Sequence, residues 1–248
     1  MVSTGVSYII AGYNEEAIIE SAIRECHAAI SSDFADYELI LVDDASTDNT
    51  RTIMESLANE LENTVMLHNL VNLNFGTSVL RGLMAASKDV IIYNAVDLPL
   101  SPKLTPSIVN EMQNYDVLVL ERRQYHATGW RKLTSSANTI LLHALFPGLT
   151  KGTPILNFVQ VFRKDVVNLV KPLARSPIFV WPEMVFRAKM HKGIRVGNMP
   201  VDVTFNEARR GSFGKPHDII WGIYDMLRFR LKTGKIKKEL ERQYKDAK

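Results

Sequence analysis

Residues 37–48, YELILVDDASTD, decide the fold of this chain, because an apolar run ends there in two carboxylates and a Ser/Thr-rich turn. The same arrangement occurs twice more before residue 100. The run Val6–Ala11 leads into Tyr13-Asn14-Glu15-Glu16, and the run Val90–Tyr93 leads into Asn94-Ala95-Val96-Asp97. Short apolar runs bounded by turns are typical of buried strands. Acidic groups at the carboxyl ends of successive strands occupy the place where open α/β sheets bind ligands.

Segments with a helical period separate these runs. Apolar residues recur at helical spacing in Glu15–Ile30, and a helix is expected from about Asp48 to Leu61. A further strand is expected at Thr64–Leu67, followed by a helix over Thr77–Ser87. Strands that alternate with helices predict βαβ units and a mostly parallel sheet. We therefore expect an α/β fold with a mostly parallel central sheet flanked by helices.

The second half of the chain continues this alternation. Strands are expected at Asp116–Glu121, Val159–Phe162 and Val196–Phe205. Helices are expected at Leu104–Gln113, Ser135–Leu145, Val166–Val170 and Trp181–His191, and as one or two helices from His217 to about Tyr244. No low-complexity linker interrupts the chain. We expect one α/β domain over residues 1–214 and a basic helical extension over residues 215–248.

The composition favours a single large core in a cytoplasmic protein. The 248 residues are 46% hydrophobic, which is ample for one α/β domain. No apolar run approaches the roughly eighteen residues of a membrane span, and the amino terminus lacks a basic-then-apolar signal. The single cysteine, Cys26, excludes an internal disulfide and a cysteine metal site.

The positive charge of the chain is concentrated at its end. Residues 215–248 carry ten Lys or Arg against five Asp or Glu, a net charge of +5, whereas the whole chain carries +3. An apolar face is expected beside these cations, formed by Ile219, Ile223, Met226 and Leu227. Such a segment suits an anionic membrane surface, and a solvated helix face is the alternative. The sequence contains no nucleic-acid motif, so we expect no nucleic-acid partner.

The three acidic motifs, in this order, resemble those of the family 2 glycosyltransferases of the GT-A fold, especially the dolichyl-phosphate mannose synthase group. The stretch Val42-Asp43-Asp44-Ala45-Ser46-Thr47-Asp48 is similar to the family's Val-Asp-Asp-Gly-Ser-Thr-Asp. The resemblance covers most of residues 5–215. It implies a GT-A (Rossmann-like) sheet and an enzyme that takes a sugar from a nucleotide-diphosphate donor.

The resemblance also implies which residues bind the nucleotide. It places Asp44 on the base, where a carboxylate accepts from an N–H of the base edge. Two turn or capping aspartates are the alternative interpretation of the pair. Glu15 suits either the nucleotide or the first turn of a helix, where a negative charge is favourable. The implied nucleotide-binding residues are Ala11, Tyr13, Glu15, Asp44, Asn74 and Gly76.

The third acidic motif departs from the family at the metal site. In the resembled enzymes an Asp-x-Asp motif holds Mg²⁺ or Mn²⁺, which neutralises the diphosphate. Here Asp97 aligns with the second aspartate, but Ala95 replaces the first. One carboxylate can hold Mg²⁺ together with substrate phosphates and waters. We expect Mg²⁺ or Mn²⁺ at Asp97, with a metal-free site as the alternative.

The acceptor side is expected to use Glu183 and several arginines. Glu183 falls where the resembled enzymes place an acidic residue, and it is a candidate general base for a hydroxyl acceptor. A helix-start carboxylate is the alternative. Arginines can clamp phosphates with paired hydrogen bonds, or they can be plain surface residues. The candidates for binding the diphosphate or the acceptor are Arg122, Arg131, Arg209 and Arg210.

The resemblance implies an inverting glycosyltransferase, and the basic end of the chain suggests a peripheral place at the inner face of a membrane. Its acceptor would be a polyprenyl phosphate or a cell-surface glycan precursor. Pro154, Phe158 and Gln160 depart from the family pattern on the acceptor side, as Ala95 does at the metal site. Ala95, Pro99, Pro154 and Phe158 motivate the alternative, a catalytically inactive relative that binds a nucleotide sugar or serves as a partner subunit in glycan assembly.

Overall fold

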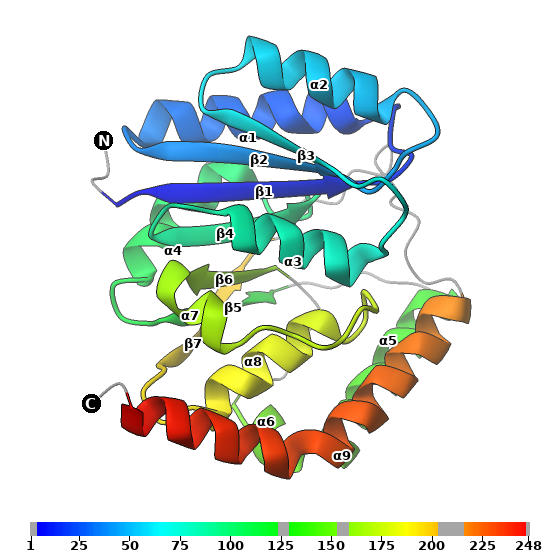
Figure 1. Ribbon diagram of the computed structural model, residues 1–248, viewed down its shortest axis with the longest axis vertical. Helices are drawn as coiled ribbons and strands as arrows, with labels where there is room; N and C mark the ends of the chain where they lie inside the picture. The colour runs from blue at the N-terminus through cyan, green and yellow to red at the C-terminus, as the bar shows by residue number, and fades with distance from the viewer. Residues whose placement is uncertain (1–3, 124–128, 153–158, 203–215, 247–248) are drawn as a thin grey trace.

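A central sheet organises the molecule. The structure is a computed structural model that describes residues 4–123, 129–152, 159–202 and 216–246. Within these residues, seven strands form one sheet in the order β3-β2-β1-β4-β6-β5-β7, and only β6 runs antiparallel to its neighbours (Figure 1). The strands are β1 (Val6–Gly12), β2 (Tyr37–Asp43), β3 (Thr64–His68), β4 (Val90–Ala95), β5 (Val117–Arg122), β6 (Gln160–Arg163) and β7 (Val196–Val201). The expected mostly parallel α/β sheet is confirmed.

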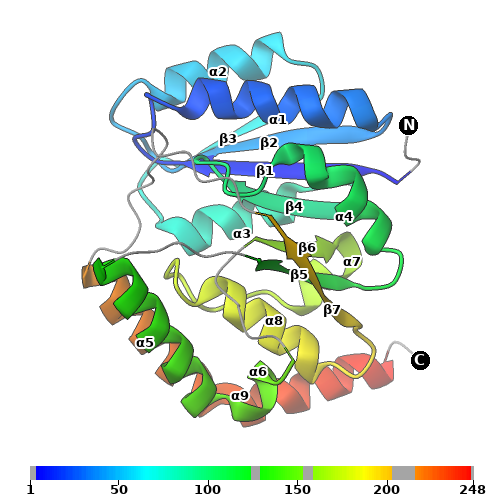
Figure 2. The ribbon, with the colours of Figure 1, turned by 180° about the vertical axis from the view of Figure 1, so that it is seen from behind.

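Helices cover both faces of the sheet and create three layers. Because strand side chains alternate, Leu39 and Leu41 of β2 face one core, whereas Ile40 and Val42 face the other. One face carries α1 (Ile19–Asp33), α2 (Thr50–Glu60) and α4 (Thr105–Glu111), which follows the short turn η1 (Pro102–Leu104), as Figure 2 shows. The other face carries α3 (Phe75–Ala85), α5 (Gly129–Leu145), α6 (Pro147–Thr150), α7 (Lys164–Leu169), α8 (Val180–Met190) and α9 (Pro216–Asp246).

The last helix, α9, belongs to the second of these cores. It is one continuous helix over the segment expected from His217 onward, and it buries Met226, Phe229, Ile236 and Leu240. The ring of Phe229 lies 5.6 to 6.3 Å from the rings of Phe146, Phe179 and Phe186. Among the helices of the described ranges, none combines the length and apolarity needed to cross a bilayer.

Several element boundaries differ from the expected ones, among them the start of the helix expected from Ser135, which begins at Gly129. The helix after β1 begins at Ile19 instead of Glu15, because Glu15 starts a turn whose carbonyl accepts from the N–H groups of Ile18 and Ile19. The strand expected over Val196–Phe205 is described as far as Val201. Residues 203–205 lie outside the described part of the chain.

Candidate functional site

The parallel pairing of β1, β2 and β4 brings their carboxyl ends to one edge of the sheet (Figure 1). Gly12 pairs in register with Asp43, and Ala11 pairs with Ala95. The loops that follow these strands therefore meet at the same edge, as the sequence predicts. Ala11 is half-buried there, and Tyr13 is exposed to solvent.

Hydrogen bonds join the loop after β1 to the loop after β2. The N–H of Asn14 donates to Oγ of Ser46 at 3.1 Å, and the N–H of Thr47 donates to Oδ1 of Asn14 at 2.8 Å. The N–H of Glu15 donates to Oγ1 of Thr50 at 2.8 Å. Asn14 adopts a left-handed backbone with φ of +56°, which asparagine tolerates better than most residues. The two loops thus form one bonded unit.

The two aspartates at the end of β2 have different environments. Asp43 is fully buried, and its Oδ1 accepts from the N–H of Ser46 at 3.1 Å while Oδ2 pairs with Nδ1 of His68 at 2.8 Å. Between the two aspartates and Ser46, Ala45 takes a left-handed backbone with φ of +61°. Asp43 therefore has the turn-forming role that the alternative interpretation gave to both aspartates.

Asp44 is also buried, but the described residues engage only one of its carboxylate oxygens. Oδ1 accepts from Nδ2 of Asn69 and from the N–H of Leu73, both at 2.8 Å. Oδ2 has no hydrogen-bond partner among the residues that the structure describes. One oxygen of Asp44 is thus left for the N–H of a ligand, at the edge where the three loops meet.

The turn at Asn74 and Gly76 packs backbone against backbone. Asn74 precedes α3 with φ of +67°. The N–H of Gly76 donates to the carbonyl of Arg175 at 3.0 Å, and a Cβ at Gly76 would lie 2.7 Å from Cα of Arg175. A glycine is required because any side chain would collide with this backbone. The nucleotide-side segment is therefore fixed against a loop from the second half of the chain.

Glu183 is bound into that loop from α8. The side chain is 1% exposed, and its two oxygens accept from the N–H groups of Leu173 and Ala174 at 2.9 and 2.8 Å. Nε of Arg187 also donates to it at 2.8 Å. This geometry fits the alternative interpretation, a structural carboxylate, because two N–H groups and a guanidinium already bind the group that was expected to act as the acceptor base.

Asp225 of α9 holds the same loop from the other side. Its Oδ2 accepts from the N–H groups of Arg175 and Ser176, both at 3.0 Å. Glu183 and Asp225 together bind four consecutive N–H groups, those of residues 173–176. Helices α8 and α9 thus position residues 173–176, which contact the start of α3 at Gly76.

Carboxylates approach one another where the loops after β1 and β4 meet. Burial raises the pKa of Glu15, and the nearby carboxylates of Asp97 and Asp48 raise it further. Burial also raises the pKa of Tyr93, with Asp97 and Glu15 as the lesser causes. Carboxylates that lie this close together favour a proton or a cation between them.

Asp97 and Glu15 fit a divalent cation that arrives with phosphates. Mg²⁺ commonly takes one or two carboxylates and completes its shell with phosphate oxygens and waters. Ala95, half-buried at the end of β4, supplies no ligand. Over the described ranges, no group of three or more His, Cys, Asp or Glu side chains is placed to hold a metal ion. The donor set therefore suits a cation shared with a ligand and not a cage made by the protein alone.

Of the four arginines expected to bind phosphates, Arg122 is the one whose side chain the structure describes. Arg122 ends β5, which runs in the same direction as β4, so it lies at the same edge of the sheet as the acidic loops. Arg131 belongs to α5, but its side chain is outside the described residues. Arg209 and Arg210 also lie outside them.

Glu121 is a candidate that the motif analysis did not identify. It lies at the carboxyl end of β5, and its Oε1 is buried with no hydrogen-bond partner in the described part of the chain. Burial raises its pKa. The sequence signal for Glu121 was available, because Asp116–Glu121 is another apolar run that ends in a carboxylate.

Three residues depart from the family pattern on the acceptor side. Of these, Gln160 is fully buried on β6, and Pro154 and Phe158 lie outside the described residues.

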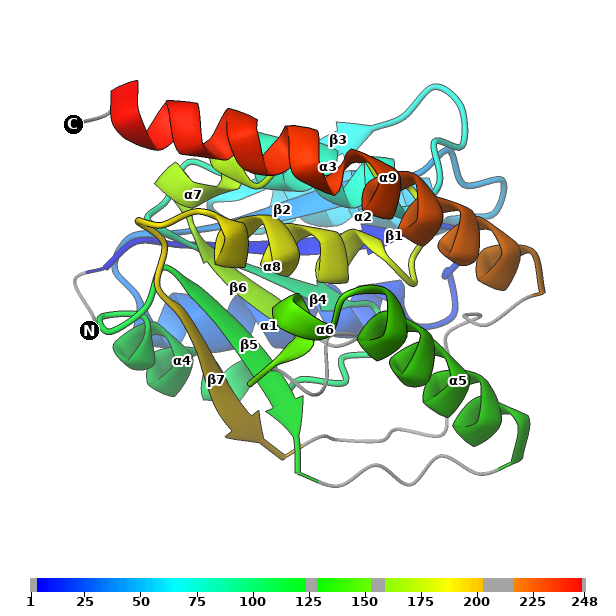
Figure 3. The same ribbon diagram turned by 90° about the horizontal axis from the view of Figure 1, so that it is seen from below.

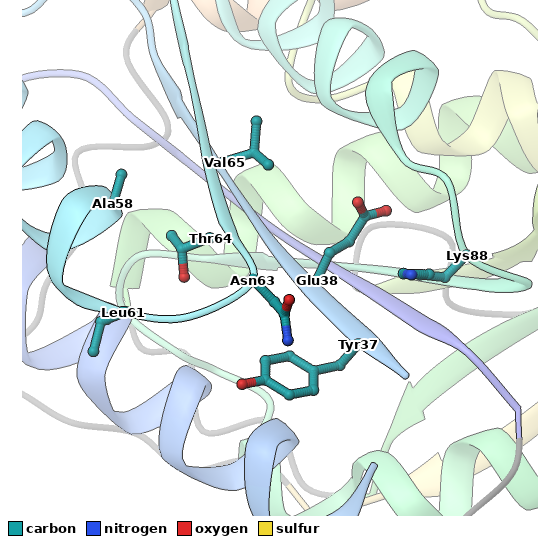
Figure 4. Close-up of a pocket in the computed structure, with 8 residues that line it drawn as sticks. All are labelled: Tyr37, Glu38, Ala58, Leu61, Asn63, Thr64, Val65 and Lys88. Atoms are coloured by element: carbon teal, nitrogen blue, oxygen red, sulfur yellow. The ribbon is translucent and has the colours of Figure 1, made fainter. Parts of the chain in front are cut away.

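The pocket drawn in Figure 4 lies at the opposite edge of the sheet. It has a volume of about 330 Å³ and is lined by Tyr37 and Glu38 at the start of β2, Thr64 at the start of β3, and Lys88 before β4. The parallel strands run from this edge toward the acidic loops. We therefore assign this pocket no part in binding at those loops.

The chain matches one protein family and resembles two curated bacterial proteins. The model of the family described as Glycosyl transferase family 2 matches residues 7–167. An undecaprenyl-phosphate 4-deoxy-4-formamido-L-arabinose transferase from Proteus mirabilis (strain HI4320) is 33% identical over 137 residues. A protein of the same name from Aeromonas hydrophila subsp. hydrophila is 32% identical over 133 residues. Each match covers 52% of this chain and 40% of the relative, so the chain spans less than half the length of these curated relatives.

Solved structures share the fold at lower sequence identity. A glucosyl-3-phosphoglycerate synthase from Mycobacterium tuberculosis, in complex with Mn²⁺, uridine diphosphate and phosphoglyceric acid, superposes with a TM-score of 0.67 at 18% identity. The superposition covers 93% of this chain and 78% of that chain. Its complex with uridine diphosphate gives a TM-score of 0.65 at 20% identity, covering 92% and 80%. At these identities the likeness establishes the fold.

Proposed function

Because this chain belongs to glycosyl transferase family 2, we propose that it transfers a sugar from a nucleotide-diphosphate donor to a phosphorylated acceptor. The finer proposal is a polyprenyl-phosphate acceptor and inversion at the sugar carbon that reacts. The names of the two bacterial relatives, which are undecaprenyl-phosphate sugar transferases, support the acceptor class. The phosphoglyceric acid in the structural neighbour supports a phosphorylated acceptor more generally.

The observation that carries this proposal is the half-engaged carboxylate of Asp44. Oδ1 is fixed by Asn69 and Leu73, so Oδ2 is held in place and can accept an N–H from the edge of a nucleobase. Tyr13 and Ala11 lie on the neighbouring loop and strand, where the nucleoside would pass between them. Asn74 and Gly76 follow Leu73, whose N–H binds the same carboxylate.

Asp97, with Glu15 beside it, would hold a divalent metal such as Mg²⁺ or Mn²⁺ at the donor diphosphate. When bound, the cation supplies charge neutralisation that makes the nucleoside diphosphate a better leaving group. Through the cation the carboxylates of Asp97 and Glu15 would orient the donor, and the cation would offset their mutual repulsion. Arg122, Arg131, Arg209 and Arg210 remain the proposed partners of the diphosphate or the acceptor.

The hydrogen bonds that already occupy the carboxylate of Glu183 agree with a phosphate acceptor, which needs no general base. The acceptor phosphate oxygen is already anionic, so it can form the new bond to the sugar carbon while the bond from that carbon to the diphosphate breaks. No proton has to be removed, and no general base is required. A hydroxyl acceptor would need such a base, for which Glu121 is better placed than Glu183 because its Oε1 is not bound by the described residues.

The direct test is transfer of radiolabelled sugar from UDP- and GDP-linked donors to undecaprenyl phosphate, with Mn²⁺ present. We expect a lipid-linked product with one donor class, and its loss in Asp97→Asn. The second candidate function, a non-catalytic nucleotide-sugar-binding relative, is favoured by Ala95 in place of the first metal aspartate. Nucleotide binding without transfer from any donor would support that second candidate.

A further inference from the structure

The first half of α9 carries apolar side chains on two opposite faces. One face is buried in the core through Met226 and Phe229. The other face is exposed and consists of five residues spaced at three and four positions, so that they align along the helix. We call this set the outer stripe: Ile220, Ile223, Tyr224, Leu227 and Leu231. The apolar face expected from the sequence was wrong in part, because Met226 points inward while Ile223 and Leu227 point outward.

The outer stripe is too continuous to be ordinary surface. Leu231 is 88% exposed and Ile220 is 68% exposed. Trp221 is exposed beside the stripe, and its ring meets the ring of Tyr224 edge-on at 5.6 Å. From Ile220 to Leu231 the stripe extends about 16 Å, given the helical rise of about 1.5 Å per residue. Isolated exposed apolar residues are common, but a contiguous patch of this kind marks an interaction surface.

The charges around the outer stripe are almost all positive. Residues 219–238 contain six Lys or Arg and a single carboxylate, Asp225. That carboxylate faces the core, where it accepts from the N–H groups of Arg175 and Ser176. Cations therefore flank the stripe and continue past it as far as Glu239 and Glu241: Arg228, Arg230, Lys232, Lys235, Lys237 and Lys238.

We propose that the outer stripe rests on an anionic lipid bilayer, with α9 lying in the plane of the headgroups. An apolar face with flanking cations is the composition of an interfacial helix. Tryptophan and tyrosine favour the level of the headgroups, and basic residues are attracted to anionic lipid. A second copy of the chain is a poorer occupant, because a symmetric contact would bring the same cations face to face.

The position of the stripe connects it to the acidic loops. The amino end of α9 lies on the side of the molecule toward which the carboxyl ends of β1 and β2 point, and Figure 3 shows α5 and the first half of α9 projecting on that side. The inference deepens the proposed function and rests on it only here: a lipid-linked acceptor would reach the site from the surface on which α9 lies. The opposite face of the same helix, through Asp225, holds the loop against Gly76.

The test is co-sedimentation of the full chain with phosphatidylcholine vesicles, with and without phosphatidylglycerol. We expect binding that requires phosphatidylglycerol and weakens as salt is raised, since salt screens the attraction. The double variant Leu227→Gln, Leu231→Gln removes two stripe residues while keeping good helix formers. Its partition coefficient should fall about tenfold or more, because the variant removes two of the apolar side chains that would be buried in the bilayer.

Val65→Gln is the matched control, since Val65 is an exposed apolar residue on β3 at the far end of the sheet. It should bind vesicles like the unmodified chain. Circular dichroism and urea unfolding of all three proteins would show that they are equally folded. Equal vesicle binding by the stripe variant and the control would overturn the proposal.

A concentration-dependent dimer that the stripe variant abolishes, without vesicle binding, would also overturn it. Transfer to a detergent-solubilised acceptor is measured separately. Failure of vesicle binding with transfer intact rejects the membrane surface alone, whereas failure of transfer with binding intact rejects the proposed function alone.

Discussion

Hydrogen bonds to backbone N–H groups fix two regions of the molecule: the loops after β1 and β2, and the loop at residues 173–176. The side chains that accept these hydrogen bonds come from different parts of the chain. In the first region the partners are side chains of the motifs themselves, such as Asn14 and Thr50. In the second region the partners are carboxylates of two helices, Glu183 of α8 and Asp225 of α9. The nucleotide side is therefore self-contained in sequence, whereas the loop that abuts it depends on tertiary packing.

Carboxylates that could bind a ligand differ from structural ones in how many of their oxygens the protein engages. Asp43 and Glu183 are buried, and each binds groups of the protein through both of its oxygens. Asp44 keeps one oxygen without a partner among the described residues. Substitutions at Glu183, Gly76, Glu15 and Ala45 test how the two regions are held, with expected effects that decrease in this order.

The largest effect is expected for Glu183→Gln. The substitution leaves the buried guanidinium of Arg187 without its counter-charge and weakens the bonds to Leu173 and Ala174. Breaking one side of a buried ion pair costs about 3 kcal/mol or more of unfolding free energy. Urea unfolding measures it. Glu60→Gln is the control, because Glu60 pairs with Arg24 at an exposed site and should leave the unfolding midpoint nearly unchanged. Wild-type stability in Glu183→Gln, with transfer abolished, would instead restore the role of acceptor base.

Gly76→Ala should give the next largest effect. The new Cβ would meet the backbone of Arg175, which cannot rotate away as a side chain could. We expect a loss of roughly 2 kcal/mol in unfolding free energy, the usual cost of overpacking, together with weaker nucleotide binding. Gly148→Ala is the matched control, because a Cβ there meets nothing within 4 Å. Equal stability and equal nucleotide affinity in the two variants would show that the close packing of the two regions is unimportant.

Glu15→Gln should have a smaller effect that depends on pH. Burial, Asp97 and Asp48 raise the folded pKa of Glu15 above its unfolded value, so the wild type loses stability as the pH rises through the interval between the two. The variant lacks this loss and should be the more stable protein at neutral pH, with the difference vanishing below about pH 4. Urea midpoints between pH 4 and pH 7 measure this. A difference that is independent of pH would contradict the repulsion.

Ala45→Gly should give the smallest effect, a gain in stability. Alanine at φ of +61° is strained, and glycine is not, while the unfolded chain gains entropy from the glycine. The net gain is about 0.5 kcal/mol, because a left-handed alanine costs roughly 1 kcal/mol and the entropy offsets part of it. Thermal unfolding should show a slightly higher midpoint. A lower midpoint would mean that the turn after Asp44 is not strained.

The nucleotide side of the sheet was predictable because its signals are local. Apolar runs ended by acidic turns predicted β1, β2 and β4, and parallel pairing then required their loops to meet. The distinction between Asp43 and Asp44 was not predictable from composition or spacing, since it depends on His68, Asn69 and Leu73, which reach the two aspartates only in the folded chain.

The acceptor side was harder to predict for a physical reason. Glu183 and Arg187 are four residues apart, a spacing that any pair on one helix can have. Their burial depends on the loop at residues 173–176 and on Phe229 of α9. The same holds for α9, where apolar residues occupy both faces, so that periodicity alone did not identify which face the core would cover. Glu121, by contrast, carried the same signal as the first three motifs.

The central claim is that the second oxygen of Asp44 receives a nucleobase, and isothermal titration of UDP and GDP tests it most directly. Asp44→Asn keeps an oxygen for Asn69 and Leu73 but replaces the other with an amide that cannot accept. With Mn²⁺ present, we expect one nucleotide to bind the wild type and to bind Asp44→Asn about tenfold or more weakly, since a hydrogen bond to a charged group contributes about 1.5 to 3 kcal/mol. Binding should also weaken when EDTA removes the metal. Equal affinity in the wild type and Asp44→Asn would contradict the account.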